Sequence, residues 1–270
     1  MIRLVFALRR AAHLSLDEFQ RYWREQHGPL VASHAHHLGI LRYVQTHRVD
    51  TPANDAMDKA RGGNMEPPHD GVAELWWDNE AALTAALSDS AGIAAGAELL
   101  ADEQKFIDLP NSPLWFAHEY PQVNPTPENI IATPSSTISR VFFPLRQLPA
   151  MDDATARRYW LTEHGPIVRR GAQAVGMLCY RQVHRYDTPL TNGLREARGT
   201  KVDPYLGHAE AWSDRARASS APETAAAGRS FVTDEHNFID FARSAIWLGK
   251  EHSFIDRRER PARAARLAWT

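Results

Sequence analysis

Residues 22–31 read YWREQHGPLV, and residues 159–168 read YWLTEHGPIV. The two stretches belong to one long repeat, because the same spacing aligns Arg3 with Arg140 and Pro52 with Pro189 without a gap. After a loop, the match resumes with GVAELW (71–76) over GHAEAW (207–212) and closes with DEQKFID (102–108) over DEHNFID (234–240). A repeat of this length indicates a tandem duplication in which each copy is one structural unit.

The duplication divides the chain into two domains, residues 1–120 and 137–252. Between them, residues 121–136 (PQVNPTPENIIATPSS) contain four prolines, which is typical of an extended linker. An arginine-rich tail, residues 253–270, follows the second domain and is interpreted as a surface arm or an oligomer contact.

Composition excludes several classes of protein. The 270 residues are 43% hydrophobic and 24% charged, which is normal for a globular chain. Lys and Arg number 31 against 33 Asp and Glu, a net charge of −2, so no overall basic field would hold a nucleic acid. The single cysteine, Cys179, forbids an intrachain disulfide and a cysteine-rich zinc site. The longest apolar runs, such as residues 4–8, are too short to span a membrane. We therefore expect a cytoplasmic protein that binds neither membranes nor nucleic acids.

Periodicity within each half predicts an α+β fold of β-α-β-β-α-β order. Residues 3–9 alternate in polarity as a strand does, whereas Ser15 and Glu18 form a capping box that starts a helix. Gly28-Pro29 is expected to break or kink that helix. Four strands with two helices on one face give the ferredoxin-like pattern. Because each sheet would leave one face bare, we expect the halves to pack sheet to sheet as an internal pseudo-dimeric α/β barrel. Higher oligomers of such pseudo-dimers remain open.

Strand alternation also suggests what lines the space between the two sheets. Tyr43, Gln45 and His47 share one face of their strand, and Glu74 and Trp76 share one face of the next. We expect these faces to look into a polar, aromatic cavity between the sheets, with Ala73 and Leu75 packing on the helices.

The motifs FxxYWxxxHGPL (19–30), the Tyr-x-Gln strand, GVAELW and DExxFID together resemble the EthD-domain family. The second half carries the same signature from Tyr159 to Asp240. The resemblance implies a dimeric α/β barrel, here built within one chain. It also implies cofactor-free chemistry on hydrophobic small molecules, such as isomerisation, decarboxylation, dehydration or cyclisation, with oxygenase and haem-binding relatives. Fold analogy alone does not assign the reaction.

Three duplicated pairs are candidate catalytic residues. Imidazole titrates near neutral pH, so the histidines beside Gly-Pro are candidate general acids or bases, or helix C-terminal caps. The strand histidines could relay protons or only form hydrogen bonds. The strand glutamates are bases if burial raises their pKa, or they pair with Arg3 or Arg140. These pairs are His27 and His164, His47 and His184, and Glu74 and Glu210.

A second group of residues is expected to bind substrate. The aromatic and amide side chains on the presumed cavity face could stack on a planar molecule or polarise a carbonyl. His208 shares a face with Glu210 and has no histidine counterpart in the first half. Arginines of the loop at 53–70 and its copy could meet an anionic substrate beneath a lid, or form ion pairs. The residues are Tyr43, Gln45, Trp76, Tyr180, Gln182, Trp212, His208, Arg61 and Arg198.

No cofactor is expected. His34, His36 and His37 are not repeated in the second half and lack a matching carboxylate spacing, so they are a weak metal signal. We therefore predict a lyase or isomerase that acts by His/Glu acid-base catalysis on an apolar, aromatic or lactone-like small molecule, with one dominant active site. The alternatives are a haem-binding or oxygen-using barrel oxidoreductase and a non-catalytic ligand-binding or accessory protein.

Overall fold

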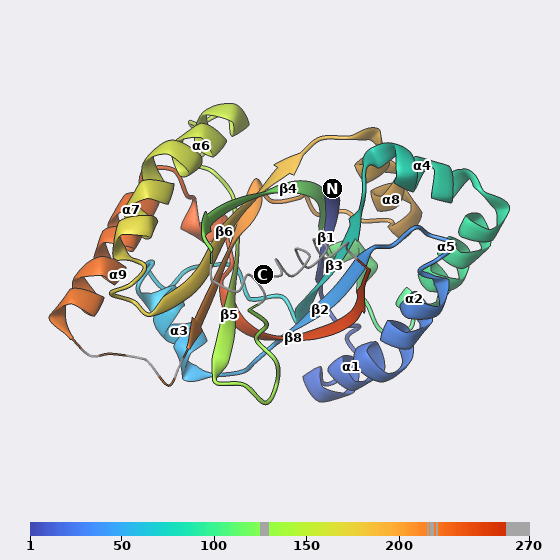
Figure 1. Cartoon of the computed structure of the whole chain (residues 1–270), viewed down its shortest axis with the longest axis horizontal. Helices are drawn as coiled ribbons and strands as arrows, with labels where there is room; N and C mark the ends of the chain where they lie inside the picture. The colour runs from blue at the N-terminus through green and yellow to red at the C-terminus, as the bar shows by residue number, and fades with distance from the viewer. Residues whose placement is uncertain (125–129, 215, 217–218, 220, 258–270) are drawn as a thin grey trace, which may run out of the picture.

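Eight antiparallel strands close into one barrel in the computed structural model, which describes residues 1–124, 130–214, 216, 219 and 221–257 (Figure 1). The order around the barrel is β1-β3-β2-β8-β5-β7-β6-β4. The strands are β1 (Ile2–Leu8), β2 (Arg42–Arg48), β3 (Gly71–Trp77), β4 (Leu114–Val123), β5 (Ile138–Leu145), β6 (Met177–Tyr186), β7 (Gly207–Asp214) and β8 (Trp247–Asp256).

Each half contributes four neighbouring strands, and the halves join edge to edge where β2 pairs with β8 and β4 pairs with β6. The prediction of one internal barrel built from two repeats is therefore confirmed. Strand β4 continues to Val123 and β8 to Asp256, so the first residues of the expected linker and of the expected tail are strand. Residues 258–270 of that tail lie outside the described residues.

Helices cover the outside of the barrel on two opposite sides (Figure 1). The capping box is present, because the Ser15 hydroxyl accepts the Glu18 backbone N–H at 3.2 Å. The described helices are α1 (Leu16–Tyr22), α2 (Gly28–His34), α3 (Pro52–Lys59), α4 (Glu80–Ser88), α5 (Ser90–Glu103), α6 (Asp153–Tyr159), α7 (Gly165–Gly171), α8 (Pro189–Arg198) and α9 (Pro222–Glu235).

The helix does not break at Gly28-Pro29. A five-residue π-helical segment, Trp23–His27, joins α1 to α2, and Trp160–His164 does the same between α6 and α7. The Gly28 N–H donates to the carbonyl of Trp23, so the wider π-helical turn continues without interruption into α2. Pro29 then occupies the first turn of α2.

Helices α3 and α8 cross to the opposite half of the molecule. The sequence predicted a loop at residues 53–70, but its first part forms α3, which begins at Pro52. Figure 1 shows α3 on the side of α7 and α9, and α8 on the side of α4 and α5. Each half therefore covers the outer face of the other half.

The interior of the barrel is packed rather than hollow. Its core includes Val5, Trp115, Phe142, Val183 and Trp247, all less than 1% exposed. These are inward-facing residues of five strands, and their bulk fills the space where the sequence predicted a cavity. The expected pocket between the two sheets is therefore wrong.

The assignment of Tyr43, Gln45 and His47 to that inner face is also wrong. In the register of β2 with β3, Tyr43 lies opposite Leu75 and Gln45 opposite Ala73. Directly opposite residues of an antiparallel pair share a face, so these side chains point toward the helices. The same applies to Tyr180, Gln182 and His184, because Tyr180 lies opposite Ala211.

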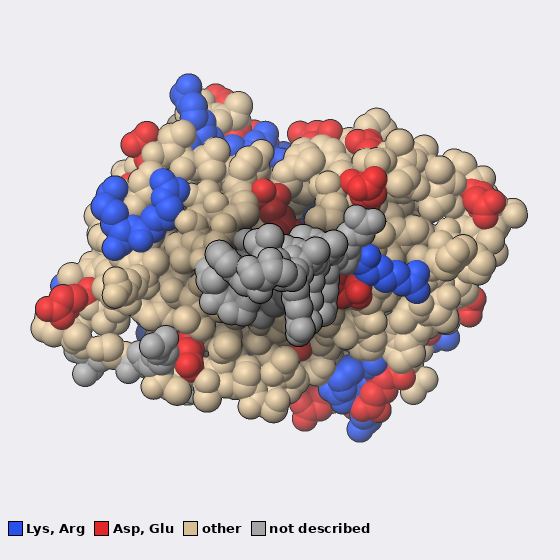
Figure 2. Space-filling model, viewed as in Figure 1, with Lys and Arg blue, Asp and Glu red and all other residues tan. Residues whose placement is uncertain are grey.

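Figure 2 shows basic and acidic side chains scattered over a face that consists mostly of other residues. Of the described helices, none has the length and apolar character needed to cross a bilayer.

Candidate active site

Two equivalent cavities lie outside the barrel, one in each half, between the helices and the outer face of the strands. The second-half pocket encloses about 870 Å³ and the first-half pocket about 310 Å³. The second-half pocket is formed by β5, β6, β7, α7 and α9 and is closed by α3 of the first half. The first-half pocket is formed by β1, β2, β3, α4 and α5 and is closed by α8 of the second half.

A histidine–aspartate pair stands at the wall of each pocket. His164 Nδ1 lies 2.8 Å from Asp234 Oδ2 at the end of α9, and His27 Nδ1 lies 2.9 Å from Asp102 Oδ2. An ionised carboxylate can only accept a hydrogen bond, so Nδ1 carries the proton and donates. The remaining nitrogen, Nε2, then holds a lone pair and is able to take up a proton.

Each aspartate is fixed from a second side by a tyrosine. The Tyr159 hydroxyl donates to Asp234 at 2.8 Å, and the Tyr22 hydroxyl donates to Asp102 at 2.6 Å. The hydrogen bond from His27, supported by those from Tyr22 and Lys105, holds the pKa of Asp102 far below its usual range. A carboxylate that stays ionised keeps its histidine in one tautomer and stabilises the imidazolium that forms on protonation.

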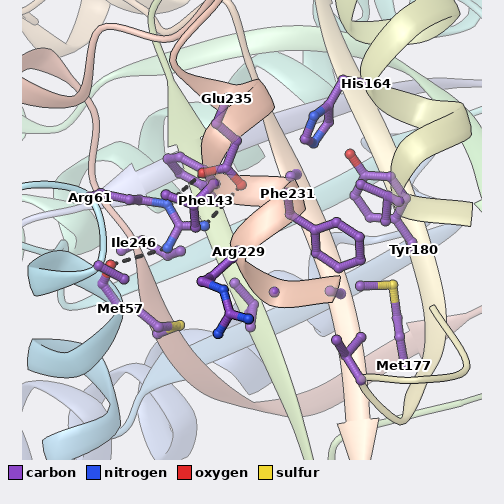
Figure 3. Close-up of a pocket in the computed structure, with 18 of the residues that line it drawn as sticks. Met57, Arg61, Phe143, His164, Met177, Tyr180, Arg229, Phe231, Glu235 and Ile246 are labelled. Carbon is purple, nitrogen blue, oxygen red and sulfur yellow. Dashed lines mark hydrogen bonds and ion pairs between the residues drawn. The ribbon is translucent and has the colours of Figure 1, made fainter. Parts of the chain in front are cut away.

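Tyr180 lies beside His164 on the same side of the second-half pocket (Figure 3). The indole N–H of Trp160 donates to the Tyr180 hydroxyl at 3.2 Å. Burial raises the pKa of Tyr180, so the phenol stays protonated at neutral pH. Because its oxygen already accepts a hydrogen bond, its own proton is available to a ligand. Tyr43 and Trp23 repeat this arrangement in the first half.

The strand glutamines and histidines support the helix above them. Gln182 donates to the backbone carbonyl of Trp160 at 2.7 Å, and His184 stacks on the Trp160 ring with centroids 4.5 Å apart. Burial lowers the pKa of His184 to about 3. Gln45 and His47 are placed in the same way in the first half. None of these four side chains lines either of the two pockets.

The strand glutamates lie inside the barrel, where they pair with arginines. Glu74 and Glu210 are each bonded by Arg3 and Arg140, and Arg140 approaches Glu74 Oε2 at 2.5 Å. This is the pairing that the sequence left as the alternative to a free base. Burial opposes ionisation of Glu210, but Arg140 and Arg3 hold its pKa well below the usual range. A carboxylate held ionised by two guanidinium groups is a weak proton acceptor.

The remaining barrel candidates belong to the same charged cluster. Trp212 donates to Glu251 at 2.8 Å and Trp76 donates to Glu119 at 2.6 Å. His208 lies 2.6 Å from Glu210, and burial lowers its pKa to about 4 despite that contact. The structure thus places Trp76, Trp212 and His208 in the barrel interior, away from both pockets.

Among the described residues, one group could supply three metal ligands, namely Glu74, His208 and Glu210. Arg3 and Arg140 bond both carboxylate oxygens of Glu74 and Oε1 of Glu210, whereas Oε2 of Glu210 has no hydrogen-bond partner among the described residues. His34 instead pairs with Glu98 at 2.9 Å on the surface.

The two loop arginines form crossing ion pairs. Arg61 of the first half binds Glu235 of the second half through two contacts of 2.8 and 2.9 Å. Arg198 of the second half binds Glu103 of the first half through two contacts of 2.8 Å. All four side chains are nearly buried. The alternative of an ion pair is therefore observed, although it is not exposed as expected.

Sequence reasoning missed the acidic partners of both arrangements. Asp102 and Glu103, with their copies Asp234 and Glu235, open the repeated motif DExxFID. The repeat was visible, but no role was assigned to its acidic pair. Both roles depend on contacts between residues 70 or more positions apart.

The EthD domain model matches the chain twice, over residues 11–110 and 148–242. No curated protein matches.

Three solved structures resemble the whole chain at low identity. A provisionally assigned monooxygenase from Lactobacillus acidophilus is 11% identical, with 95% of this chain and 96% of that chain covered and a TM-score of 0.46. A provisionally assigned monooxygenase from Fusobacterium nucleatum is 8% identical, with 93% and 91% covered and a TM-score of 0.48.

A mutant chlorite dismutase from Candidatus Nitrospira defluvii is 11% identical, with 94% of this chain and 92% of that chain covered and a TM-score of 0.42. Likenesses of this strength carry no argument about activity. The family match, by contrast, covers most of both repeats, and so the chain belongs to the EthD-domain family, with two copies of the domain in one polypeptide.

Proposed function

We propose that the protein is a cofactor-independent lyase or isomerase whose active site is the second-half pocket. The observation that carries this proposal is the His164–Asp234 pair at the wall of a largely apolar cavity of about 870 Å³. Cavities of roughly 300–1,000 Å³ with few polar groups are typical of small-molecule sites. The substrate is an apolar molecule, aromatic or lactone-like, that carries a carbonyl group.

The chemistry follows from the positions of two side chains. His164 Nε2 removes a proton from the carbon next to the carbonyl, and the electron pair of that C–H bond moves onto the carbonyl oxygen. The Tyr180 hydroxyl donates to this oxygen as its negative charge develops. The imidazolium, stabilised by Asp234, then returns the proton to another carbon, which is isomerisation. Alternatively it gives the proton to a departing hydroxyl, which is dehydration.

Each half then corresponds to a ferredoxin-like unit, which is the finer description that we propose for the fold. The support is the strand order β4-β1-β3-β2 in the first half and β8-β5-β7-β6 in the second. The pocket of each unit lies between its helices and the outer face of its own strands, so the barrel is the scaffold and the outer face is the site.

Deuterium exchange tests the proposed chemistry without knowledge of the natural product. Unsaturated lactones and aromatic ketones are incubated with the protein in D2O, and incorporation of deuterium is measured by mass spectrometry. We expect incorporation with the wild-type protein and its loss in His164→Gln and Asp234→Asn, with His27→Gln as the matched control. Incorporation that persists in His164→Gln overturns the assignment. Binding of the compounds without exchange supports the non-catalytic alternative.

One observation also favours the haem-binding alternative. A histidine that lines a cavity and whose Nδ1 donates to a carboxylate is an arrangement that can hold haem iron through Nε2. His164 would be the ligand, and the group would supply one-electron or oxygen chemistry. Titration with hemin distinguishes the two functions. A Soret band that forms with wild-type protein and is lost in His164→Gln supports haem, whereas the absence of a saturable band supports the cofactor-independent enzyme.

A further inference from the structure

The second-half pocket contains one charged group that the acid-base proposal does not use. Arg229 of α9 lines the pocket together with Arg61 and Glu235. Figure 3 shows Arg61 joined to Glu235, whereas no such link is drawn to Arg229, an exposed residue that lies on the other side of the view from His164. In the described part of the chain, no hydrogen bond or ion pair of Arg229 is found.

The charges of the pocket therefore do not balance. Arg61 and Glu235 neutralise each other through two contacts, and Arg229 is the one further arginine, lysine, aspartate or glutamate among the described residues that line the pocket. The surrounding lining is apolar and includes Phe143, Met177 and Phe231. A cation at the edge of an apolar cavity favours a ligand with an anionic group at one end.

Comparison of the halves shows that Arg229 is specific to the larger pocket. Ala97 occupies the equivalent position in the first-half pocket, as the alignment of DEQKFID with DEHNFID requires. The same comparison explains the difference in volume. Leu75 and Trp77 of the first-half pocket become Ala211 and Ser213 in the second. The half with the larger pocket thus also holds the cation that is unpaired among the described residues.

Arg229 and the partner of His164 lie on the same helix, α9. Arg229 and Asp234 are five residues apart, which corresponds to an axial separation of about 7.5 Å, or more than one turn. Asp234 holds His164 at the reacting end. A ligand that contacts both His164 and Arg229 must therefore extend along α9.

We infer that the second-half pocket selects an apolar ring compound bearing a carboxylate, which Arg229 binds at the end opposite His164. This inference rests on the proposed function and narrows its substrate class to organic acids. Arg229 touches the ligand but takes no part in proton transfer, so it determines specificity.

Two fluorescent probes that differ by one anionic group test the inference. They are 8-anilino-1-naphthalenesulfonate and its neutral counterpart N-phenyl-1-naphthylamine, in which a hydrogen replaces the sulfonate. We expect Arg229→Ala to weaken binding of the sulfonate about tenfold and to leave the neutral probe within about twofold. Arg158→Ala is the matched control, because Arg158 is an exposed arginine of the same half that lies outside the pocket.

A pocket-filling variant shows where the probes bind. Ala211→Leu with Ser213→Trp introduces the first-half residues and should weaken binding of both probes. The inference is overturned if Arg229→Ala leaves the sulfonate affinity unchanged, if it weakens both probes equally, or if the filled variant binds the sulfonate as tightly as the wild-type protein. Circular dichroism of each variant confirms folding. Because Arg229 is exposed, its replacement by alanine is expected to leave the fold intact.

This test is independent of catalysis. If the probes discriminate as expected but no compound exchanges deuterium, the acid-binding inference stands and the enzymatic proposal fails. If exchange occurs but Arg229→Ala does not affect the anionic probe, the enzymatic proposal stands and this inference fails.

Discussion

The two pockets contain the same reactive groups but differ in the space around them. His27–Asp102 and His164–Asp234 have nearly equal distances, and each pair lies beside a buried tyrosine. The volumes are about 310 and 870 Å³. The substitutions that enlarge the second pocket lie on β7, away from the dyad. The arrangement of histidine, aspartate and tyrosine is therefore present in both halves, while the larger cavity is found in one.

The largest expected effect concerns the two histidines. His164→Gln should lower the rate of deuterium exchange by about 10²–10⁴-fold, because it removes the general base. His27→Gln should leave the rate nearly unchanged, because we place the active site in the larger, second-half pocket. The exchange rate is measured alongside the melting temperature of each variant. Equal losses of exchange rate in two folded variants would show that both pockets are active, which would contradict the expected difference between them.

The crossing ion pairs should, by contrast, behave alike. Arg61→Ala and Arg198→Ala each leave a nearly buried glutamate without its partner, which costs about 3–5 kcal/mol in the free energy of unfolding. Urea denaturation measures both. The double variant Arg61→Ala with Glu235→Gln should recover part of the loss, because no unpaired charge remains. A difference of several kcal/mol between the single variants would show that the two crossing ion pairs do not contribute equally to stability.

Acid should destabilise the protein through histidines that burial keeps neutral. Burial lowers the pKa of His184 to about 3 and of His208 to about 4, from the ordinary value near 6.5. Below pH 6.5 the unfolded chain takes up protons that the folded chain does not, so stability falls as the pH drops toward these values. Each such group contributes about 1.4 kcal/mol per pH unit within its window.

One variant isolates the contribution of His208 to the pH dependence of stability. Val72 occupies the position equivalent to His208, so His208→Val imitates the first half, while Arg3 and Arg140 still hold Glu210. The slope of unfolding free energy against pH, measured in urea between pH 6 and pH 4, should decrease by about 1.4 kcal/mol per pH unit. An unchanged slope would mean that His208 is protonated in the folded protein.

The smallest expected effect is a gain in stability when the larger pocket is filled. Ala211→Leu with Ser213→Trp adds apolar contacts where the second half has empty space, and should raise the free energy of unfolding by about 0.5–2 kcal/mol. Thermal unfolding measures the gain. The reverse pair in the first half, Leu75→Ala with Trp77→Ser, should lower it by more, because Trp77 is 4% exposed and donates to the Leu38 carbonyl at 2.7 Å. A loss of stability in the filled variant would show that the cavity cannot accept these side chains.

Much of the architecture could be predicted from the repeat. The alternation of β1 and the motif around Trp76 indicated strands, and identity between halves indicated an internal barrel. The direction of each strand face could not be predicted, because alternation separates two faces without saying which one meets the helices. That uncertainty put Tyr43 and Gln45 on the wrong side.

The candidate site was predictable only in part. His164 and Tyr180 were selected from the sequence, and the structure places both on the pocket wall, where their roles stay predictions. Asp234 was not selected, because its place in the candidate site depends on a contact with a residue 70 positions away. The crossing of Arg61 to the other half depends on how α3 packs, which no local pattern records.

The joining of both repeats in one polypeptide has a consequence for how this protein can change. In a dimer of two identical chains, a single codon change alters both symmetry-related sites at once, so neither can change alone. Here Leu75 and Ala211 are encoded separately, and so are Ala97 and Arg229. One site could therefore accumulate substitutions while the other preserved the ancestral arrangement, a freedom that identical subunits lack.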